Sequence, residues 1–184
     1  SVGHAAIFSF YATKVITTGE GGMVMSNSHD LMNRVRDLRE YDQNQDSGVR
    51  YNYKMTDIQA SIGLAQLERL QGFIHRRRAI AHEYYKAFET FPIQVPPRDD
   101  GHIYYRYIID LGEDSEPHIE AVGKKGIGCA LPVYMPLHRY LDMEGYPKTE
   151  QVWRQSLSIP IYPSLTEGEL NRVIEAVAGV LRRA

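Results

Sequence analysis

The feature that most restricts the fold of this chain is a long apolar stripe of helical spacing behind a capping box. Thr56 and Gln59 have the spacing at which a hydroxyl and an amide side chain satisfy each other's backbone N–H groups. Behind them, apolar residues recur at helical spacing, with an interruption at Gly72, as far as Phe91. Because this stripe is longer than an ordinary globular helix, residues 57–91 are predicted to form one bent helix or two consecutive helices that link two subdomains.

Three consecutive arginines, Arg76, Arg77 and Arg78, lie within this stripe. Three neighbouring helical positions point in different directions and cannot share one ligand-facing side. We therefore expect these arginines to form a solvated face.

The rest of the chain has the mixed pattern of an α/β protein, in which short apolar or alternating runs indicate strands and longer amphipathic runs indicate helices. Strands are expected at residues 5–10, 23–25, 105–111 and 127–134. Helices are expected over residues 117–125 and 151–157. Two more helices are expected, one after an N-cap at Asp30 and one behind a second capping box from Thr166 to Glu169.

Composition excludes several kinds of partner. The 184 residues carry 21 basic and 23 acidic side chains, so no basic excess is present to hold a nucleic acid. Cys129 is the sole cysteine, which excludes an internal disulfide and a cysteine-based zinc site, and no metal site is expected. No apolar run has the length of a membrane span and no signal peptide opens the sequence. We therefore expect a cytoplasmic protein without a membrane partner.

The segment from Ser9 to Gly22 is the most informative for chemistry. An expected strand ends near Ser9, and Lys14 precedes the glycines at 19, 21 and 22. A partly desolvated lysine amine can condense with a carbonyl, and glycines permit positive φ and close backbone approach. The pattern matches neither a phosphate-binding P-loop nor a dinucleotide-binding turn. Taken alone, a lysine near glycines is ordinarily a surface residue of a turn.

The run Ser9-Phe-Tyr-Ala-Thr-Lys14, followed by Thr18-Gly-Glu-Gly-Gly-Met-Val24, resembles the active-site lysine segment of the DegT-type sugar aminotransferases. These are pyridoxal 5′-phosphate (PLP) enzymes of fold type I, the aspartate aminotransferase fold. The similarity covers essentially the whole chain and continues in residues 51–60 and 64–67 and, more loosely, in 126–128, 136–138 and 158–163.

The resemblance implies an α/β fold, the C-terminal part of a PLP-dependent transferase of fold type I. Residues 1–56 would be the end of the large PLP-binding domain, incomplete because its upstream half is missing. Residues 57–91 would be the long linking helix and 92–184 the small C-terminal domain. In the family the aspartate that pairs with the pyridine nitrogen lies upstream of the lysine. We therefore expect this chain to be the C-terminal half of a longer enzyme and to be inactive by itself.

The resemblance also implies residue roles. Lys14 would be the catalytic residue that bonds covalently to PLP, and Ser9 would bind the PLP phosphate. Asn52 would reach the phosphate in the neighbouring subunit, so that a homodimer shares its active sites. Tyr134 and His138 lie where family members line the substrate pocket, although each equally fits an ordinary packing role.

The function implied is a transaminase that aminates a nucleotide-linked keto sugar with an amino acid, expected to be glutamate, as donor, in polysaccharide biosynthesis. A PLP-dependent sugar dehydratase is an alternative, but the resemblance would then lead us to expect histidine where this chain has Lys14. A second alternative is a non-catalytic regulatory or dimerisation module, since a fold alone does not fix a function.

Overall fold

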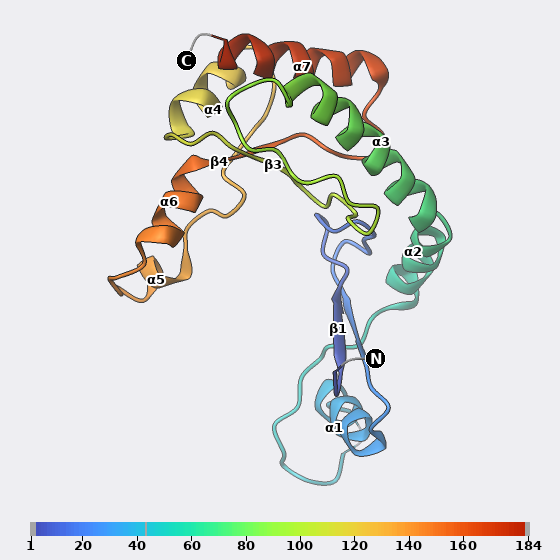
Figure 1. Ribbon diagram of the computed structural model, residues 1–184. Helices are drawn as coiled ribbons and strands as arrows, with labels where there is room; N and C mark the ends of the chain where they lie inside the picture. The colour runs from blue at the N-terminus through green and yellow to red at the C-terminus, as the bar shows by residue number, and fades with distance from the viewer. Residues whose placement is uncertain (1–2, 43, 183–184) are drawn as a thin grey trace. The chain divides into compact units, whose positions relative to one another are not determined.

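The computed structural model describes residues 3–42 and 44–182, and the chain divides into two compact units, Ser1–Gln71 and Gly72–Ala184. The first unit contains a two-stranded antiparallel sheet, in which Ser9 is paired with Gly22, and two helices. Its elements are β1 (Ala6–Ser9), β2 (Gly22–Met25), α1 (His29–Arg39) and α2 (Asp57–Glu68) (Figure 1).

The first unit buries very little of itself. Of its residues that the structure describes, Thr18 is the only buried one. Ile7 on β1 is 81% exposed and Ile58 on α2 is 76% exposed, although both have the apolar character of core residues. A two-stranded sheet is at best marginally stable in water without further packing. These apolar side chains therefore form a surface suited to being covered by additional protein.

The second unit is built on an antiparallel pair of strands with helices packed against it. Ile109 is paired with Leu157 in the register, and the ladder is extended by single bridges from Gln94 to Asp110 and from Ala130 to Ser158. Its elements are α3 (Leu70–Phe88, of which the first two residues belong to the first unit), β3 (Tyr107–Asp110), α4 (Glu116–Gly123), α5 (Leu137–Tyr140), α6 (Pro147–Gln155), β4 (Ser156–Ile159) and α7 (Glu167–Leu181).

The hydrophobic core lies in this second unit. Tyr84 and Phe88 of α3, Ile109 of β3, Leu157 of β4 and Val177 of α7 are each no more than 1% exposed. Figure 1 shows α3, α4 and α7 on the same side of the β3–β4 pair. The helices therefore cover one face of this small sheet, which fixes the direction in which the alternate side chains of β3 and β4 point.

Both capping boxes are confirmed. The hydroxyls of Thr56 and Thr166 each accept a hydrogen bond from the backbone N–H three residues later. The side chains of Gln59 and Glu169 in turn accept from the backbone N–H of Thr56 and Thr166. The stripe behind Thr56 forms two consecutive helices, α2 and α3, as one of the two alternatives predicted.

Two local predictions are wrong. The N-cap of α1 is Ser28, whose Oγ accepts from the N–H of Leu31 at 3.3 Å, while Asp30 lies inside the first turn. Residues 127–134 form no extended strand, since only Ala130 bridges to Ser158. The strand next to Ala130 is β4, which lies between Ala130 and β3 in the ladder and begins directly where α6 ends. Tertiary pairing, which local periodicity does not report, decided this choice.

The expectation of a solvated arginine face is also wrong. The side chain of Arg76 donates to Leu165 O at 2.6 Å, and that of Arg78 donates to His102 O at 3.0 Å. Arg77 is 6% exposed and donates to three backbone carbonyls. The three side chains do point in different directions, but each ends on the carbonyls of a loop and ties that loop to α3.

Candidate active site

The connection between β1 and β2 forms an ordered loop closed by backbone hydrogen bonds. The N–H of Phe10 donates to Gly21 O at 2.8 Å, and the N–H of Thr18 donates to Phe10 O at 2.9 Å. The hydroxyl of Thr17 donates to the same Phe10 carbonyl at 3.0 Å. Because these bonds tie the two ends of the connection together, the segment between them, which contains Lys14, projects as a single loop.

Ser9 and Lys14 are linked through the residue Tyr11 between them. The N–H of Lys14 donates to Tyr11 O at 2.9 Å, and the N–H of Tyr11 donates to Ser9 Oγ at 3.4 Å. Both Ser9 and Lys14 are exposed. The loop therefore presents a primary amine and a hydroxyl group from one short hydrogen-bonded segment.

The glycine at position 21 is a steric requirement of this loop. Gly21 has a φ of +149°, and a Cβ built there would lie 2.6 Å from Thr18 Oγ1 and 2.7 Å from Met55 Cε. The buried Thr18 hydroxyl donates to Glu20 O at 2.6 Å, and Gln59 Nε2 donates to the same carbonyl at 3.2 Å. The start of α2 thus packs directly against the glycine turn and holds its shape.

Asn52 lies in a second loop of the first unit, between two tyrosines. The N–H groups of Tyr51 and Tyr53 donate to Leu38 O at 2.8 Å and Arg39 O at 3.4 Å, at the end of α1. The two tyrosine rings are stacked, with centroids 5.0 Å apart. Asn52 is exposed between them. The flanking contacts therefore hold this amide side chain at the surface on a fixed backbone.

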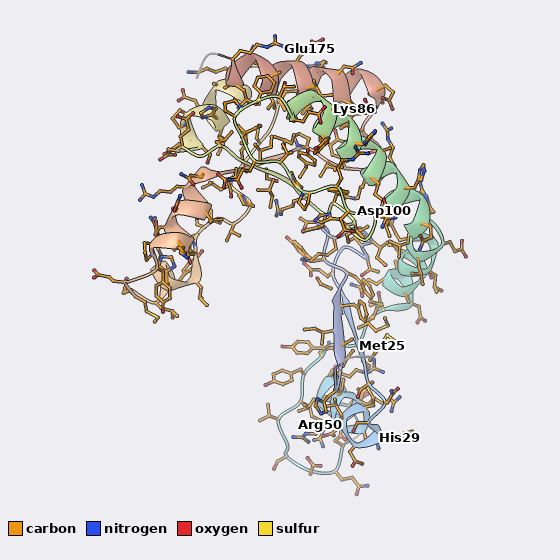
Figure 2. All side chains as sticks on the ribbon, viewed as in Figure 1. Met25, His29, Arg50, Lys86, Asp100 and Glu175 are labelled. Carbon is orange, nitrogen blue, oxygen red and sulfur yellow. The ribbon has the colours of Figure 1, made fainter. Side chains whose placement is uncertain are left out.

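Sequence reasoning missed the ion pairs that brace this second loop. Arg50 Nε lies 2.7 Å from Asp37 Oδ1 on α1, and Arg50 Nη1 lies 2.6 Å from Asp46 Oδ1; Figure 2 shows Arg50 beside α1. The hydrogen bond from Arg50 lowers the pKa of Asp46 to about 2. Lys54 and Glu40 form a further pair at 2.8 Å. The pairs that Arg50 forms with Asp37 and Lys54 forms with Glu40 join residues more than ten positions apart, so the sequence carries no local signal of them.

In the second unit, Tyr134 and His138 have different surroundings. Tyr134 is 87% exposed. His138 Nε2 lies 2.8 Å from Glu150 Oε1, and its ring stacks on Tyr146 with centroids 5.1 Å apart. Arg139 also binds Glu150 through two hydrogen bonds of 2.6 Å, which are the main cause of the lowered pKa of Glu150, about 2. Glu150, which the sequence did not single out, thus fixes both His138 and Arg139.

The chemistry of the loop at Lys14 suits PLP. An amine can bond to the cofactor's aldehyde, and the Ser9 hydroxyl, whose oxygen accepts from Tyr11, still has its own hydrogen to donate to a phosphate. Within residues 3–42 and 44–182, no three His, Cys, Asp or Glu side chains are grouped so as to hold a metal ion, and no helix is both long and apolar enough to cross a bilayer.

Comparison with known proteins gives consistent matches over the whole chain. The family model for the DegT/DnrJ/EryC1/StrS aminotransferase family matches residues 1–178. The spore coat polysaccharide biosynthesis protein SpsC of Bacillus subtilis is 32% identical over 216 residues, which cover 100% of this chain and 55% of SpsC. GDP-perosamine synthase of Caulobacter vibrioides is 34% identical over 200 residues, covering 98% of this chain and 53% of that enzyme.

The fold is shared with solved structures as well. The aminotransferase TlmJ from Streptoalloteichus hindustanus superposes with a TM-score of 0.91 at 27% identity, covering 100% of this chain and 53% of TlmJ. The α/β fold is therefore that of the C-terminal part of these aminotransferases. The chain spans about half the length of the curated relatives it matches.

Proposed function

The chain belongs to the DegT/DnrJ/EryC1/StrS aminotransferase family, and on that premise we propose that the protein aminates a keto sugar carried on a nucleotide. An amino acid, glutamate in this proposal, gives its amino group and leaves as the 2-oxo acid, while the sugar carbonyl becomes an amine. The name of one relative, GDP-perosamine synthase, supports a nucleotide-linked sugar as the acceptor.

Aminotransferases of this family use PLP. When bound, PLP supplies an aldehyde for the reacting amines and a ring that withdraws electrons from the substrate carbon. The observation that carries the proposal is the ordered β1–β2 loop, which presents the Lys14 amine and the Ser9 hydroxyl from one hydrogen-bonded segment.

Each residue of that loop has a proposed task. Lys14 Nζ would hold the cofactor covalently and would accept and return the proton at the substrate carbon that bears the nitrogen. Ser9 Oγ would donate to the cofactor phosphate. The glycine turn supports these tasks because it allows close packing against Thr18 and Met55 at the base of the loop that carries Lys14.

The remaining assignments complete the same proposal. The exposed Asn52 amide would reach the phosphate bound by the partner subunit of a homodimer, and the stacked tyrosines beside it support a fixed outward position. Tyr134 and His138 would contact the substrate. The large PLP-binding domain would end within residues 1–56, 57–91 would link it to the small domain, and 92–184 would form the small domain. A cytoplasmic location, consistent with the single cysteine, belongs to the proposal too.

The decisive test is where PLP attaches. The protein is incubated with PLP, reduced with borohydride and digested, and the modified lysine is located by mass spectrometry. One phosphopyridoxyl group on Lys14 is expected, and Lys14→Ala should abolish it; in the full-length protein, Lys14→Ala should also abolish the transfer of nitrogen from glutamate to a keto sugar nucleotide. The matched control is Lys54→Ala, which removes a lysine of the same unit that is paired with Glu40 and should leave the labelling of Lys14 intact. Labelling of another lysine, or transamination by Lys14→Ala, would overturn the proposal.

A further inference from the structure

One face of the β3–β4 sheet in the second unit carries no helix of the core. Tyr107 and Ile109 are buried against the helices, so Ile108, at the alternate position, belongs to the opposite face, and Arg106 lies in the bend directly before β3. Arg106 is exposed. This cation therefore lies at the start of β3, where it lines two hollows of the second unit.

Two hollows meet at this arginine. The larger, about 780 Å³, also has Tyr134, Arg139, Trp153 and Arg154 in its lining. The smaller, about 310 Å³, includes Arg106 as well. Hollows of this size with a few polar groups are typical of sites for small molecules. Arg106 therefore stands at the junction of a groove large enough for a nucleotide-sized ligand.

The charged side chains around the groove do not pair with Arg106, so its guanidinium can bind an anionic ligand. Among the described residues, the guanidinium of Arg106 forms no ion pair, and its one interaction is with the ring of Tyr105, whose centroid is 5.6 Å away. By contrast, Arg139 is held by Glu150 at 2.6 Å. The acidic side chains of the groove, Asp114 and Glu116, line only the larger hollow.

The aromatic residues of the groove have distinct surroundings. Trp153 is fixed, because its Nε1 donates to Val133 O at 2.9 Å and the guanidinium of Arg139 lies 4.3 Å from its ring centroid. Tyr134, which is 87% exposed, has its ring open to a stacking partner. A planar guanidinium that matches phosphate oxygens and an open aromatic ring that can stack on a base are the two groups that a nucleoside diphosphate requires.

We propose that Arg106 is the anchor for the diphosphate of the nucleotide-linked substrate, with the base stacking on Tyr134. This inference rests on the proposed function for its substrate class, but it concerns binding in the second unit and does not involve Lys14. It makes Arg106 a determinant of specificity for nucleotide-linked over free sugars, because the free sugar lacks the group that the guanidinium recognises.

Trp153 is the chain's single tryptophan and lines the groove, so its fluorescence reports on occupancy directly. The full chain, without PLP, is titrated with GDP, with inorganic pyrophosphate and with glutamate. GDP and pyrophosphate should change the emission with saturation, and glutamate should not. Loss of a charge-assisted bidentate contact should weaken GDP binding of Arg106→Gln roughly 10- to 100-fold. Arg106→Lys keeps the positive charge but loses the planar pair of N–H donors, so its affinity for GDP should lie between those of the unaltered chain and Arg106→Gln.

Arg172→Gln, an exposed arginine of α7 outside the groove lining, serves as the matched control and should bind GDP as the unaltered chain does. The inference is overturned if GDP leaves Trp153 fluorescence unchanged, if Arg106→Gln binds GDP normally while it folds like the unaltered chain, or if glutamate shows the Arg106-dependent response. A normal GDP response in a protein whose Lys14 fails to bond PLP would refute the proposed function and leave this inference standing.

Discussion

Replacement of Arg77 by methionine tests how the second unit is held together. Arg77 Nη1 donates to Tyr104 O and Tyr105 O, both at 3.1 Å, and to Ile161 O at 2.8 Å. One guanidinium nitrogen therefore joins α3 to the residues before β3 and the residues after β4. Methionine would keep much of the apolar stem and remove the nitrogen that makes all three hydrogen bonds.

The magnitude follows from two opposing effects. Hydrogen bonds from a charged donor stabilise by about 1.5–3 kcal/mol each, and the carbonyls left without a donor add a desolvation cost. Burial of the guanidinium, which lowers the pKa of Arg77, is itself unfavourable and is relieved in the variant. We expect the net loss in the free energy of unfolding to be roughly 2–4 kcal/mol.

Urea unfolding followed by Trp153 fluorescence measures this loss, because the tryptophan lies in the same unit. With a urea slope of about 2 kcal/mol/M, in the middle of the range for a small domain, the midpoint of Arg77→Met should fall by roughly 1–2 M at an unchanged slope. A much smaller slope would indicate a less cooperative transition, and the midpoint would then be compared by a second probe.

The matched control is Arg78→Met in the same helix, which removes a partly buried arginine whose side chain makes one hydrogen bond, to His102 O at 3.0 Å. The free energy of unfolding of Arg78→Met should be about 1 kcal/mol lower than that of the unaltered chain. A midpoint for Arg77→Met equal to or above that of Arg78→Met would refute the reasoning that the three carbonyls depend on Arg77.

Two further predictions concern the loop and an ion pair. Gly21→Ala should open the β1–β2 loop, because the new Cβ would lie 2.6 Å from Thr18 Oγ1; the Phe10 amide, which donates to Gly21 O, should exchange its hydrogen faster by mass spectrometry or NMR. Glu150 has its pKa lowered to about 2 by Arg139, from an ordinary 4.5, so its ion pair stabilises the fold above about pH 4.5 and loses that effect as the pH falls toward 2. As the pH falls from about 4.5 toward 2, the difference in the free energy of unfolding between the unaltered chain and Glu150→Gln, measured by urea titration, should shrink.

Each of these two predictions has a control. Gly72→Ala introduces a Cβ with no atom within 4 Å, and it should not speed exchange at Phe10. Glu175→Gln, at the exposed position on α7 labelled in Figure 2, should show no comparable acid dependence. Unchanged exchange in Gly21→Ala would show that the loop tolerates a side chain there, and a stability gap for Glu150→Gln that stays constant down to pH 2 would show that the pair does not stabilise the fold.

Several features of the fold could be read from the chain because they depend on neighbours in sequence. The capping boxes at Thr56 and Thr166 formed as predicted, since a cap is made by residues three positions apart. The strands at 6–9 and 22–25 lie within or close to the predicted runs. The motif around Lys14 was likewise sufficient to identify the family, because its residues are consecutive.

Other features were decided by groups that are distant in the sequence. The arginine run was misjudged because its acceptors are carbonyls of loops that follow much later in the chain. The part that Glu150 plays, holding His138 and Arg139, arises only when α6 lies beside α5. The strand at 156–159 was missed because pairing with β3, and not local periodicity, makes it a strand.

By itself, the sequence determined the start of α2 and of α7 and the identity of the lysine loop, since hydrogen bonds within a few residues decide the first and consecutive motif residues decide the second. Only the tertiary structure decided which side chains are buried. Ile7 and Ile109 both lie in apolar strands, yet the first is 81% exposed and the second fully buried. The physical reason is that burial depends on whether another element packs on a given face, and a strand's own residues do not specify that element.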